Sequence, residues 1–392
     1  MLVNAPRPTR PRATWDVFCR VVDNHGDAGL CWRLAADLAS RGVAVRLWID
    51  DARALTWMAP HGQDGIAVRA WPTTDDAYAV AAAEPAAVVI EAFGCGLPEP
   101  CLRHMARAHA SSAHASSTAP VWINLEYLSA EPYVERNHGL PSLQGSGIAQ
   151  GLTSWFFYPG FTTGTGGLLR EADLPQRQTR FDRRAWLADH GITPQPGERL
   201  VSLFCYPNPH LPELLRALAA SPTLLLTTPG HATDQVAQAL AQSGGPPNLR
   251  VQALPWLTQL DYDHLLWSCE LNLVRGEDSL VRAIWSGHPF LWQIYPQQDG
   301  AHASKLSAFL ARATRTGDPA LTEAIWRAAA RWNSLSTPAD EAPWALLDAT
   351  ASMSAWENLC CAWRSELTAQ PDLVTQLMAF ASAKSGSAQA KI

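Results

Sequence analysis

The residues whose types and spacing point most directly to chemistry lie in one stretch, Arg275-Gly276-Glu277-Asp278-Ser279. An apolar run at 271–274 precedes it and a helical pattern at 280–285 follows, which predicts a strand, a tight turn and a helix N-terminus. Free N–H groups and the helix dipole at such a terminus suit a phosphate, and Arg275 and Ser279 add a cation and a hydroxyl donor. Glu277 would repel phosphate, so we expect it to face a ribose hydroxyl or a reacting sugar. A simple helix cap with surface charges explains the stretch equally well.

A second candidate site lies near the N-terminus, where Asp23 and Asp27 flank a turn that contains Gly26 and Gly29. The turn lacks the G-x-G-x-x-G spacing of a dinucleotide-binding loop, and two carboxylates would repel a pyrophosphate, which disfavours a nicotinamide dehydrogenase. One carboxylate could accept a proton while the other holds the acceptor, and a guanidinium would suit both. An Asx-turn at Asp23 and a helix cap at Asp27 are an equally good explanation. His25, between them, is expected to pack within the loop.

Both candidate sites follow predicted strands in a chain that alternates strands and helices twice. In the first half we expect strands at 15–22, 43–49, 66–71, 87–92 and 121–125, and helices at 30–40 and 99–109. After a less regular region at 126–174 and a short helix at 181–190, we expect strands at 200–206, 223–227, 249–254, 271–274 and 289–295, and helices at 210–220, 232–242, 262–268, 280–285 and 301–313. This alternation predicts parallel sheets covered by helices on both faces.

The break in the alternation at 192–198 divides the chain into two Rossmann-like domains. The expected organisation is a disordered lead-in at 1–13, an N-terminal domain at 14–191, a C-terminal domain at 198–365, a helix at 366–384 that packs back on the N-terminal domain, and a disordered tail at 385–392. Because ligands bind at the carboxyl ends of parallel strands, the sequence predicts an α/β enzyme with a cleft between two lobes.

Composition excludes several classes of protein. The formal net charge of −6 gives no basic surface for nucleic acid, and no apolar run reaches the roughly 18 residues of a membrane helix. The eight cysteines form no C-x-x-C pair and no metal-ligand spacing is apparent, so we expect reduced thiols in a cytoplasmic protein with neither metal nor cofactor.

Several blocks of residues together resemble the EarP family, the protein-arginine rhamnosyltransferases of bacterial elongation factor P. The blocks lie in both halves of the chain, at 15–29, 202–206, 261–263, 273–279 and 289–297. The resemblance implies a GT-B glycosyltransferase fold, with two Rossmann-like domains facing across a cleft. It further implies an inverting transfer of L-rhamnose from dTDP-β-L-rhamnose to one arginine of elongation factor P.

The resemblance also assigns roles to individual residues. Asp27 is implied as the catalytic base with Asp23 in support, and Glu277 as essential to the reaction. The residues implied to bind dTDP-rhamnose are Asn24, His25, Gly26, Tyr206, Trp256, Gln259, Arg275, Gly276, Asp278 and Ser279.

Two positions depart from the family pattern. Trp256-Leu257-Thr258-Gln259 replaces a more usual Phe-Leu-Pro-Gln at the thymine site, and His25 replaces an aromatic Phe or Tyr. Other functions consistent with the sequence are a GT-B enzyme with another sugar or acceptor, and a non-catalytic nucleotide-sugar binding protein.

Overall fold

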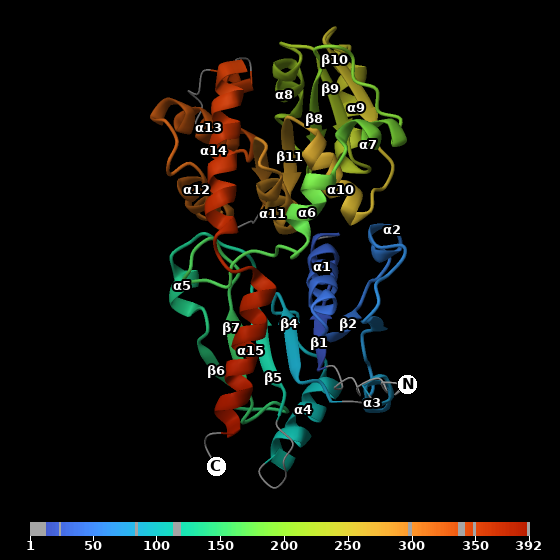
Figure 1. Cartoon of the computed structure of the whole chain (residues 1–392), viewed down its shortest axis with the longest axis vertical. Helices are drawn as coiled ribbons and strands as arrows, with labels where there is room; N and C mark the ends of the chain where they lie inside the picture. Colours follow the sequence, from blue (N-terminus) through green and yellow to red (C-terminus); the bar gives the residue numbers. More distant parts are fainter. Residues whose placement is uncertain are drawn as a thin grey trace, which may run out of the picture.

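The polypeptide forms two α/β lobes, one above the other, each built on its own sheet (Figure 1). The structure, a computed structural model, describes residues 13–22, 25–82, 85–112, 119–296, 300–335, 342–347 and 350–389. Asp23, Asn24 and Gln297 lie outside the described residues, as do positions 1–12 of the expected lead-in and 390–392 of the expected tail.

The N-terminal lobe contains a seven-stranded sheet of order β3-β2-β1-β4-β5-β7-β6, in which β6 pairs antiparallel with β7 and the other pairs are parallel. Its strands are β1 (Thr14–Cys19), β2 (Ala44–Ile49), β3 (Ile66–Ala70), β4 (Val88–Ala92), β5 (Val121–Leu125), β6 (Pro141–Leu143) and β7 (Thr153–Phe157). Its helices are α1 (Gly26–Ser40), α2 (Leu55–Met58), α3 (Asp75–Ala81), α4 (Glu99–Ser112) and α5 (Tyr133–Asn137). β4 is buried along its whole length, as expected for a parallel strand covered on both faces.

The C-terminal lobe contains a five-stranded parallel sheet of order β10-β9-β8-β11-β12. Its strands are β8 (Arg199–Leu203), β9 (Thr223–Thr227), β10 (Leu249–Ala253), β11 (Leu271–Arg275) and β12 (Phe290–Gln293). Around them lie α6 (Leu174–Arg180), α7 (Arg183–Asp189), α8 (Leu211–Leu218), α9 (His231–Ser243), α10 (Gln259–Ser268), α11 (Glu277–Ser286), α12 (Ala301–Ala313), α13 (Pro319–Trp332) and the 3-10 turn η1 (Ala345–Leu347).

Two long helices end the chain and connect the lobes (Figure 1). Helix α14 (Thr350–Thr368) packs in the C-terminal lobe, whereas α15 (Leu373–Gln389) lies against α1 and β5 of the N-terminal lobe. There, Phe380 contacts the ring of Phe157 at 5.5 Å between centroids. Helix α15 continues beyond residue 385, where a disordered tail is expected, because an established helix propagates at little cost.

Two sequence-based predictions need correction. The region 126–174 is not irregular throughout, since β7 pairs with β5 inside the sheet. Its five residues are too few to show a periodicity, and their pairing partner lies about thirty positions earlier in the chain. Helices α1, α10 and α11 also begin earlier than predicted, at Gly26, Gln259 and Glu277. The acids expected in turns therefore lie in the first turns of helices.

Candidate active site

Two adjoining cavities lie in the crevice between the lobes, and residues from both lobes line each of them. The first has a volume of about 90 Å³ and the second of about 270 Å³. Both cavities are lined by Gly26 at the start of α1 and by Gly276, Glu277 and Asp278 at the start of α11. The two stretches singled out in the sequence thus meet in one crevice.

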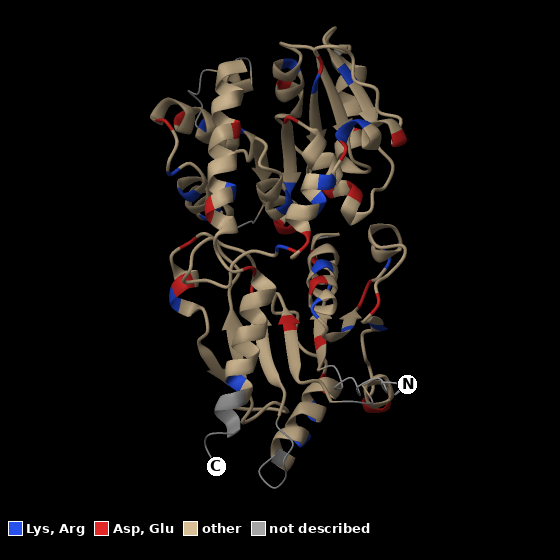
Figure 2. Cartoon of the chain, viewed as in Figure 1, with Lys and Arg blue, Asp and Glu red and all other residues tan. Residues whose placement is uncertain are grey.

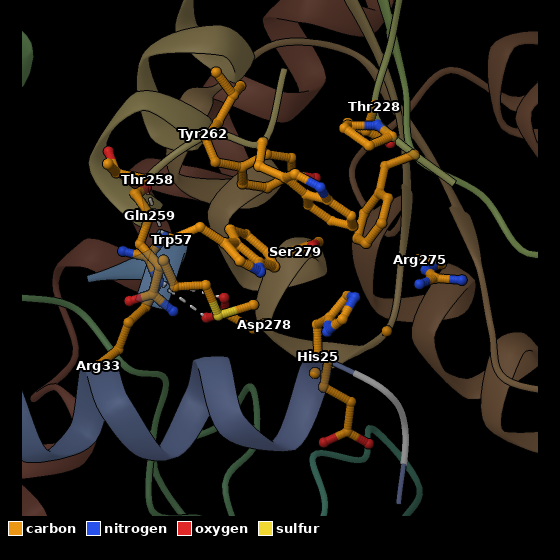
Figure 3. Close-up of a pocket in the computed structure, with 18 of the residues that line it drawn as sticks. His25, Arg33, Trp57, Thr228, Thr258, Gln259, Tyr262, Arg275, Asp278 and Ser279 are labelled. Carbon is orange, nitrogen blue, oxygen red and sulfur yellow. Dashed lines mark hydrogen bonds and ion pairs between the residues drawn. The ribbon is translucent and has the colours of Figure 1, made fainter. Parts of the chain in front are cut away.

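The floor of the first cavity is the turn between β11 and α11 (Figure 3). Gly276 has a φ of 69°, in the region that favours glycine, and this conformation lets the chain reverse directly into the helix. Ser279 lies in the first helical turn and its side chain points into the crevice (Figure 3). First-turn N–H groups have no partner within the helix, so this terminus can bind an anion.

Arg275 makes the anion site specific. It is only 7% exposed, and its guanidinium carbon lies 4.5 Å from the ring centre of Phe204 and 4.4 Å from that of Tyr206. Its Nη1 is buried and has no hydrogen-bond partner in the described part of the chain. A buried cation with an unpaired N–H group is costly unless a ligand supplies the missing charge. We therefore expect Arg275 to bind an anion at the N-terminus of α11.

An aromatic cluster closes the other end of the first cavity. The ring of Trp256 lies 4.5 Å from that of Trp57 across the crevice, and His25 meets both rings edge-on at 5.4 and 5.3 Å. Trp256 is 49% exposed, which leaves ring surface available to a planar ligand. The side chain of Gln259 also lines this cavity and donates to the carbonyl oxygen of Gly29 at 2.8 Å.

Thr258, at the position where the family resemblance leads us to expect proline, is the N-cap of α10. Its hydroxyl oxygen accepts a hydrogen bond from the backbone N–H of Asp261 at 3.1 Å and donates to the Asp261 carboxylate at 2.6 Å. This reciprocal arrangement resembles a capping box and fixes the loop that carries Trp256. The loop is thus ordered by a side-chain cap in place of a proline ring.

The second cavity is lined by Asp27. The carboxylate is 4% exposed, lies in the first turn of α1 and accepts a hydrogen bond from the backbone N–H of Val22 at 2.8 Å. Opposite stands a stacked aromatic pair, Phe93 and Tyr127, with ring centroids 4.5 Å apart. Phe93 has a φ of 57°, a strained value for a bulky residue and typical of a functional position.

Glu277 lies between the two cavities and is held by both lobes. One of its carboxylate oxygens accepts from the backbone N–H of Leu128 at 2.7 Å, and the other pairs with the Lys305 ammonium at 2.8 Å. Burial alone would lower the pKa of Lys305, but the Glu277 carboxylate outweighs it and raises the pKa above its ordinary value. The two contacts therefore fix the Glu277 side chain beside the N-terminus of α11.

The structure brings most of the expected site residues together. The cavities are lined by His25, Gly26, Asp27, Trp256, Gln259, Arg275, Gly276, Glu277, Asp278 and Ser279. Tyr206 is not among the described residues that line either cavity, and it instead supports the guanidinium of Arg275. The Asp278 carboxylate pairs with Arg33 at 3.3 Å. Asp23 and Asn24 lie outside the described residues.

Sequence reasoning missed several residues of the crevice, namely Arg33, Trp57, Phe93, Tyr127, Phe204 and Lys305. Tyr127 follows the strand predicted at 121–125, which is a signal that could have found it. Phe204 lies inside the strand predicted at 200–206, which in the structure ends at Leu203. Trp57 and Lys305 come from a short helix and a late helix, so only the packing of the lobes brings them to the site.

Comparison with known proteins identifies the family. The model of the elongation factor P rhamnosyltransferase EarP matches residues 15–382. The chain belongs to the EarP family. A protein-arginine rhamnosyltransferase of Pseudomonas putida is 43% identical to it, in an alignment that covers 94% of this chain and 98% of the relative. A protein of the same name from Neisseria meningitidis is 35% identical, covering 95% of this chain and 98% of the relative.

Solved structures confirm the expected GT-B architecture of this EarP-family chain. One that describes EarP-mediated arginine glycosylation of translation elongation factor EF-P aligns with a TM-score of 0.61 and 32% identity, over 94% of this chain and 98% of that chain. A glycosyltransferase of kitacinnamycin aligns with a TM-score of 0.50 and 14% identity, over 96% of this chain and 99% of that one, which shows the shared fold alone.

Two further observations concern the described part of this EarP-family chain. None of its helices combines the length and apolarity needed to cross a membrane. Within the same residues, no group of three or more His, Cys, Asp or Glu side chains could hold a metal ion.

Proposed function

We propose that the protein transfers L-rhamnose from dTDP-β-L-rhamnose to an arginine of elongation factor P, with inversion at the sugar carbon. Arginine rhamnosylation of elongation factor P is the family's activity. The donor and the roles of individual residues are the parts that we propose. One observation supports them: Arg275, at the end of β11, shares a crevice with the Asp27 carboxylate at the start of α1, and its buried Nη1 has no hydrogen-bond partner among the described residues.

The nucleoside diphosphate of the donor occupies the first cavity. Its diphosphate lies against Arg275, the Ser279 hydroxyl and the first N–H groups of α11, which neutralise its charge. Its thymine stacks on the exposed ring of Trp256 beside Gln259. This places the sugar near Gly276 and Glu277, where the first cavity joins the second.

The acceptor arginine enters the second cavity and meets Asp27. A protonated guanidinium is a poor nucleophile, so the carboxylate first pairs with it and localises its charge. One guanidine nitrogen then forms a bond to the anomeric carbon as the bond from that carbon to the phosphate oxygen breaks. The nitrogen's proton passes to Asp27, and the electron pair leaves with dTDP, whose charge Arg275 and the α11 N-terminus stabilise.

Attack on the face opposite the leaving group converts the β-linked donor into an α-linked product. Asp23, which the family resemblance places in support of the base, would help to orient the guanidinium. Glu277 would bind either a sugar hydroxyl or the acceptor cation, because its carboxylate is fixed at the junction of the cavities.

The test is a reaction of purified protein with elongation factor P and dTDP-β-L-rhamnose, followed by intact-mass measurement and NMR of the anomeric proton. We expect one added deoxyhexose with an α-linkage to arginine. A parallel reaction with dTDP-glucose is expected to give little product. A β-linked product would contradict inversion, and equal transfer from dTDP-glucose would contradict the donor assignment.

A further inference from the structure

A buried cluster of charged residues joins the two lobes beside the first cavity, where Figure 2 shows acidic and basic positions on α1, α6, α10 and α11. We call it the interlobe cluster. It consists of Arg33, Arg177, Arg282, Glu171, Asp263 and Asp278. Three guanidinium groups balance three carboxylates, so the cluster as a whole is neutral.

Asp263, on α10, is the centre of the cluster and is fully buried. Arg282 of α11 binds it through two nitrogens at 2.8 and 2.7 Å. Arg177 of α6 reaches it at 3.3 Å. Arg282 and Arg177 also pair with Glu171, at 2.8 and 3.3 Å. These four residues form the part of the cluster that lies in the C-terminal lobe and in the segment that leads into it.

Arg33 brings the N-terminal lobe into this cluster. It belongs to α1, is 3% exposed and uses its five N–H groups in hydrogen bonds across the crevice. Nη2 binds the Asp263 carboxylate at 2.9 Å and the backbone oxygen of Gln259 at 3.0 Å. Nη1 donates to the carboxylates of Asp263 and Glu171, and Nε donates to the carboxylate of Asp278. All three distances are 3.3 Å.

The partners of Arg33 belong to the segments that bind the donor. Gln259 lines the thymine end of the first cavity, and Asp278 stands between Glu277 and Ser279 in the anion-binding turn. Arg33 itself follows Asp27 by six residues in the same helix, a rise of about 9 Å. Arg33 therefore connects the helix of the catalytic base directly to both ends of the donor site.

We propose that Arg33 is a positioning residue, which fixes helix α1 against the donor-binding lobe so that the acceptor nitrogen held by Asp27 is aligned with the anomeric carbon. This inference rests on the catalytic arrangement proposed above. Group transfer is sensitive to displacements of about 1 Å, whereas a buried ion network adds little net stability compared with apolar packing. The network is thus better suited to setting the register of the lobes than to strengthening the fold.

A close contact beside Arg33 supports the same inference. Helix α1 passes so near the C-terminal lobe at Gly29 that an added Cβ atom would lie 3.1 Å from Gln259 Nε2 and 3.6 Å from Asp278 Oδ2. A methyl group at this position would therefore press on the Gln259 amide, which must give by a few tenths of an ångström, and would just touch Asp278. Glycine within a helix lowers its stability, so its presence here is consistent with a need for close approach.

The first test compares Arg33→Lys with Arg41→Lys. Both changes keep the charge and replace a guanidinium, one within α1 and one at its C-cap. Arg41 pairs at 2.7 Å with Asp37 of α1 and with Asp372 beside α15, away from the donor. For Arg33→Lys we expect kcat to fall at least about tenfold, with the dTDP affinity measured by calorimetry within about threefold of wild type. For Arg41→Lys we expect both quantities to remain within about twofold.

A second variant tests the inference if Arg33→Lys folds poorly. Gly29→Ala should leave the thermal stability nearly unchanged, because the preference of alanine for the helix offsets the tight contact with Gln259, and yet lower kcat by about three- to tenfold by shifting α1. A merely structural role of this contact predicts that activity and stability change together. A loss of kcat without a loss of thermal stability supports a positioning role.

The outcomes separate this inference from the proposed mechanism. If Arg33→Lys and Gly29→Ala both keep kcat within twofold of wild type, Arg33 does not position the base, whatever Asp27 does. The positioning role of Arg33 is also contradicted if Arg33→Lys lowers the dTDP affinity by as large a factor as it lowers kcat. Undiminished turnover by Asp27→Asn would instead overturn the assigned base.

Discussion

The two walls of the crevice are built in opposite ways. The C-terminal wall takes its anion site from one continuous turn, Arg275 to Ser279, backed by Phe204 and Tyr206. The N-terminal wall is assembled from separate segments that contribute Asp27, Trp57, Phe93 and Tyr127. The first wall presents a buried cation and a helix N-terminus, and the second presents a buried carboxylate and aromatic rings. In the mechanism that we propose, one wall binds the donor's charge while the other carries out the reaction on the acceptor.

The strongest test of this division is Asp27→Asn. The change removes the proton acceptor and the charge that pairs with the guanidinium, but it leaves the C-terminal wall intact. We expect kcat to fall at least about a thousandfold with the affinity for dTDP nearly unchanged. Rhamnosylation followed by mass spectrometry and calorimetry with dTDP measure the two quantities. A large loss of dTDP affinity in this variant would show that the walls do not divide the work.

Arg275→Met is the converse test on the C-terminal wall. It removes the buried guanidinium that has an unpaired Nη1, and with it a charge-assisted bond worth about 1.5–3 kcal/mol. We expect dTDP to bind about ten- to a hundredfold more weakly. Arg216→Met, on the exposed face of α8, gives the same change in net charge away from the crevice and should have no effect. Equal losses in both variants would mean that overall charge, and not the site, attracts the donor.

The same contrast explains how much of the site could be predicted from the sequence. The strand, turn and helix around residues 275–279 could be predicted because apolar residues, glycine, polar residues and a helical pattern follow one another without interruption, whereas anion binding by the turn stays a prediction. The two-lobed fold was predictable for the same reason, since each lobe alternates strands and helices in order. The resemblance of scattered blocks then supplied the sugar and the acceptor, which no local pattern contains.

The N-terminal wall could not be predicted to the same degree. Trp57 comes from a helix of four residues, which is too short to show a periodicity. Phe93 lies immediately after β4 with a φ of 57°, a conformation that its sequence pattern does not predict. Arg33 looks like an ordinary polar residue of an amphipathic helix, and its burial results only from the meeting of the lobes. Such positions depend on tertiary packing, which overrides the local preferences on which sequence reasoning rests.

Lys305→Met tests whether the C-terminal lobe also affects the acceptor, through the ion pair of Lys305 with Glu277. Without its ammonium partner, Glu277 would remain tied to the N–H of Leu128 but would lose the bond that fixes its second oxygen. We expect kcat/KM for elongation factor P to fall about tenfold, in line with the loss of one charge-assisted hydrogen bond. The affinity for dTDP should change less than this. An unchanged kcat/KM would show that the pair does not orient Glu277.

The aromatic pair of Trp57 and Trp256 crosses the crevice, so that a residue of the N-terminal wall lies at the donor site. We expect a smaller effect from changing it. Trp57 belongs to the N-terminal wall, yet its ring lies tilted by 33° against that of Trp256, with the centroids 4.5 Å apart, at the proposed thymine end of the first cavity. An aromatic contact of this kind is worth about 0.5–1.5 kcal/mol, so Trp57→Leu should raise the KM for the donor about two- to tenfold with little change in kcat. Kinetics at varied donor concentration measure both. A fall in kcat alone would place Trp57 with the acceptor.

The smallest expected effect concerns Thr258, where this chain departs from the family's proline. Thr258→Ala removes the hydroxyl that caps α10, at a cost of about 1 kcal/mol, and should lower the thermal unfolding midpoint by a few degrees. Thr258→Pro also loses the hydroxyl, but the residue already has a φ of −62°, which a proline ring adopts without strain. The ring restricts the unfolded chain and offsets the lost cap by about 0.4–1 kcal/mol, so this variant should unfold close to wild type. If calorimetric melting finds the proline variant as unstable as the alanine variant, then the two residues do not order the donor-binding loop by equivalent means.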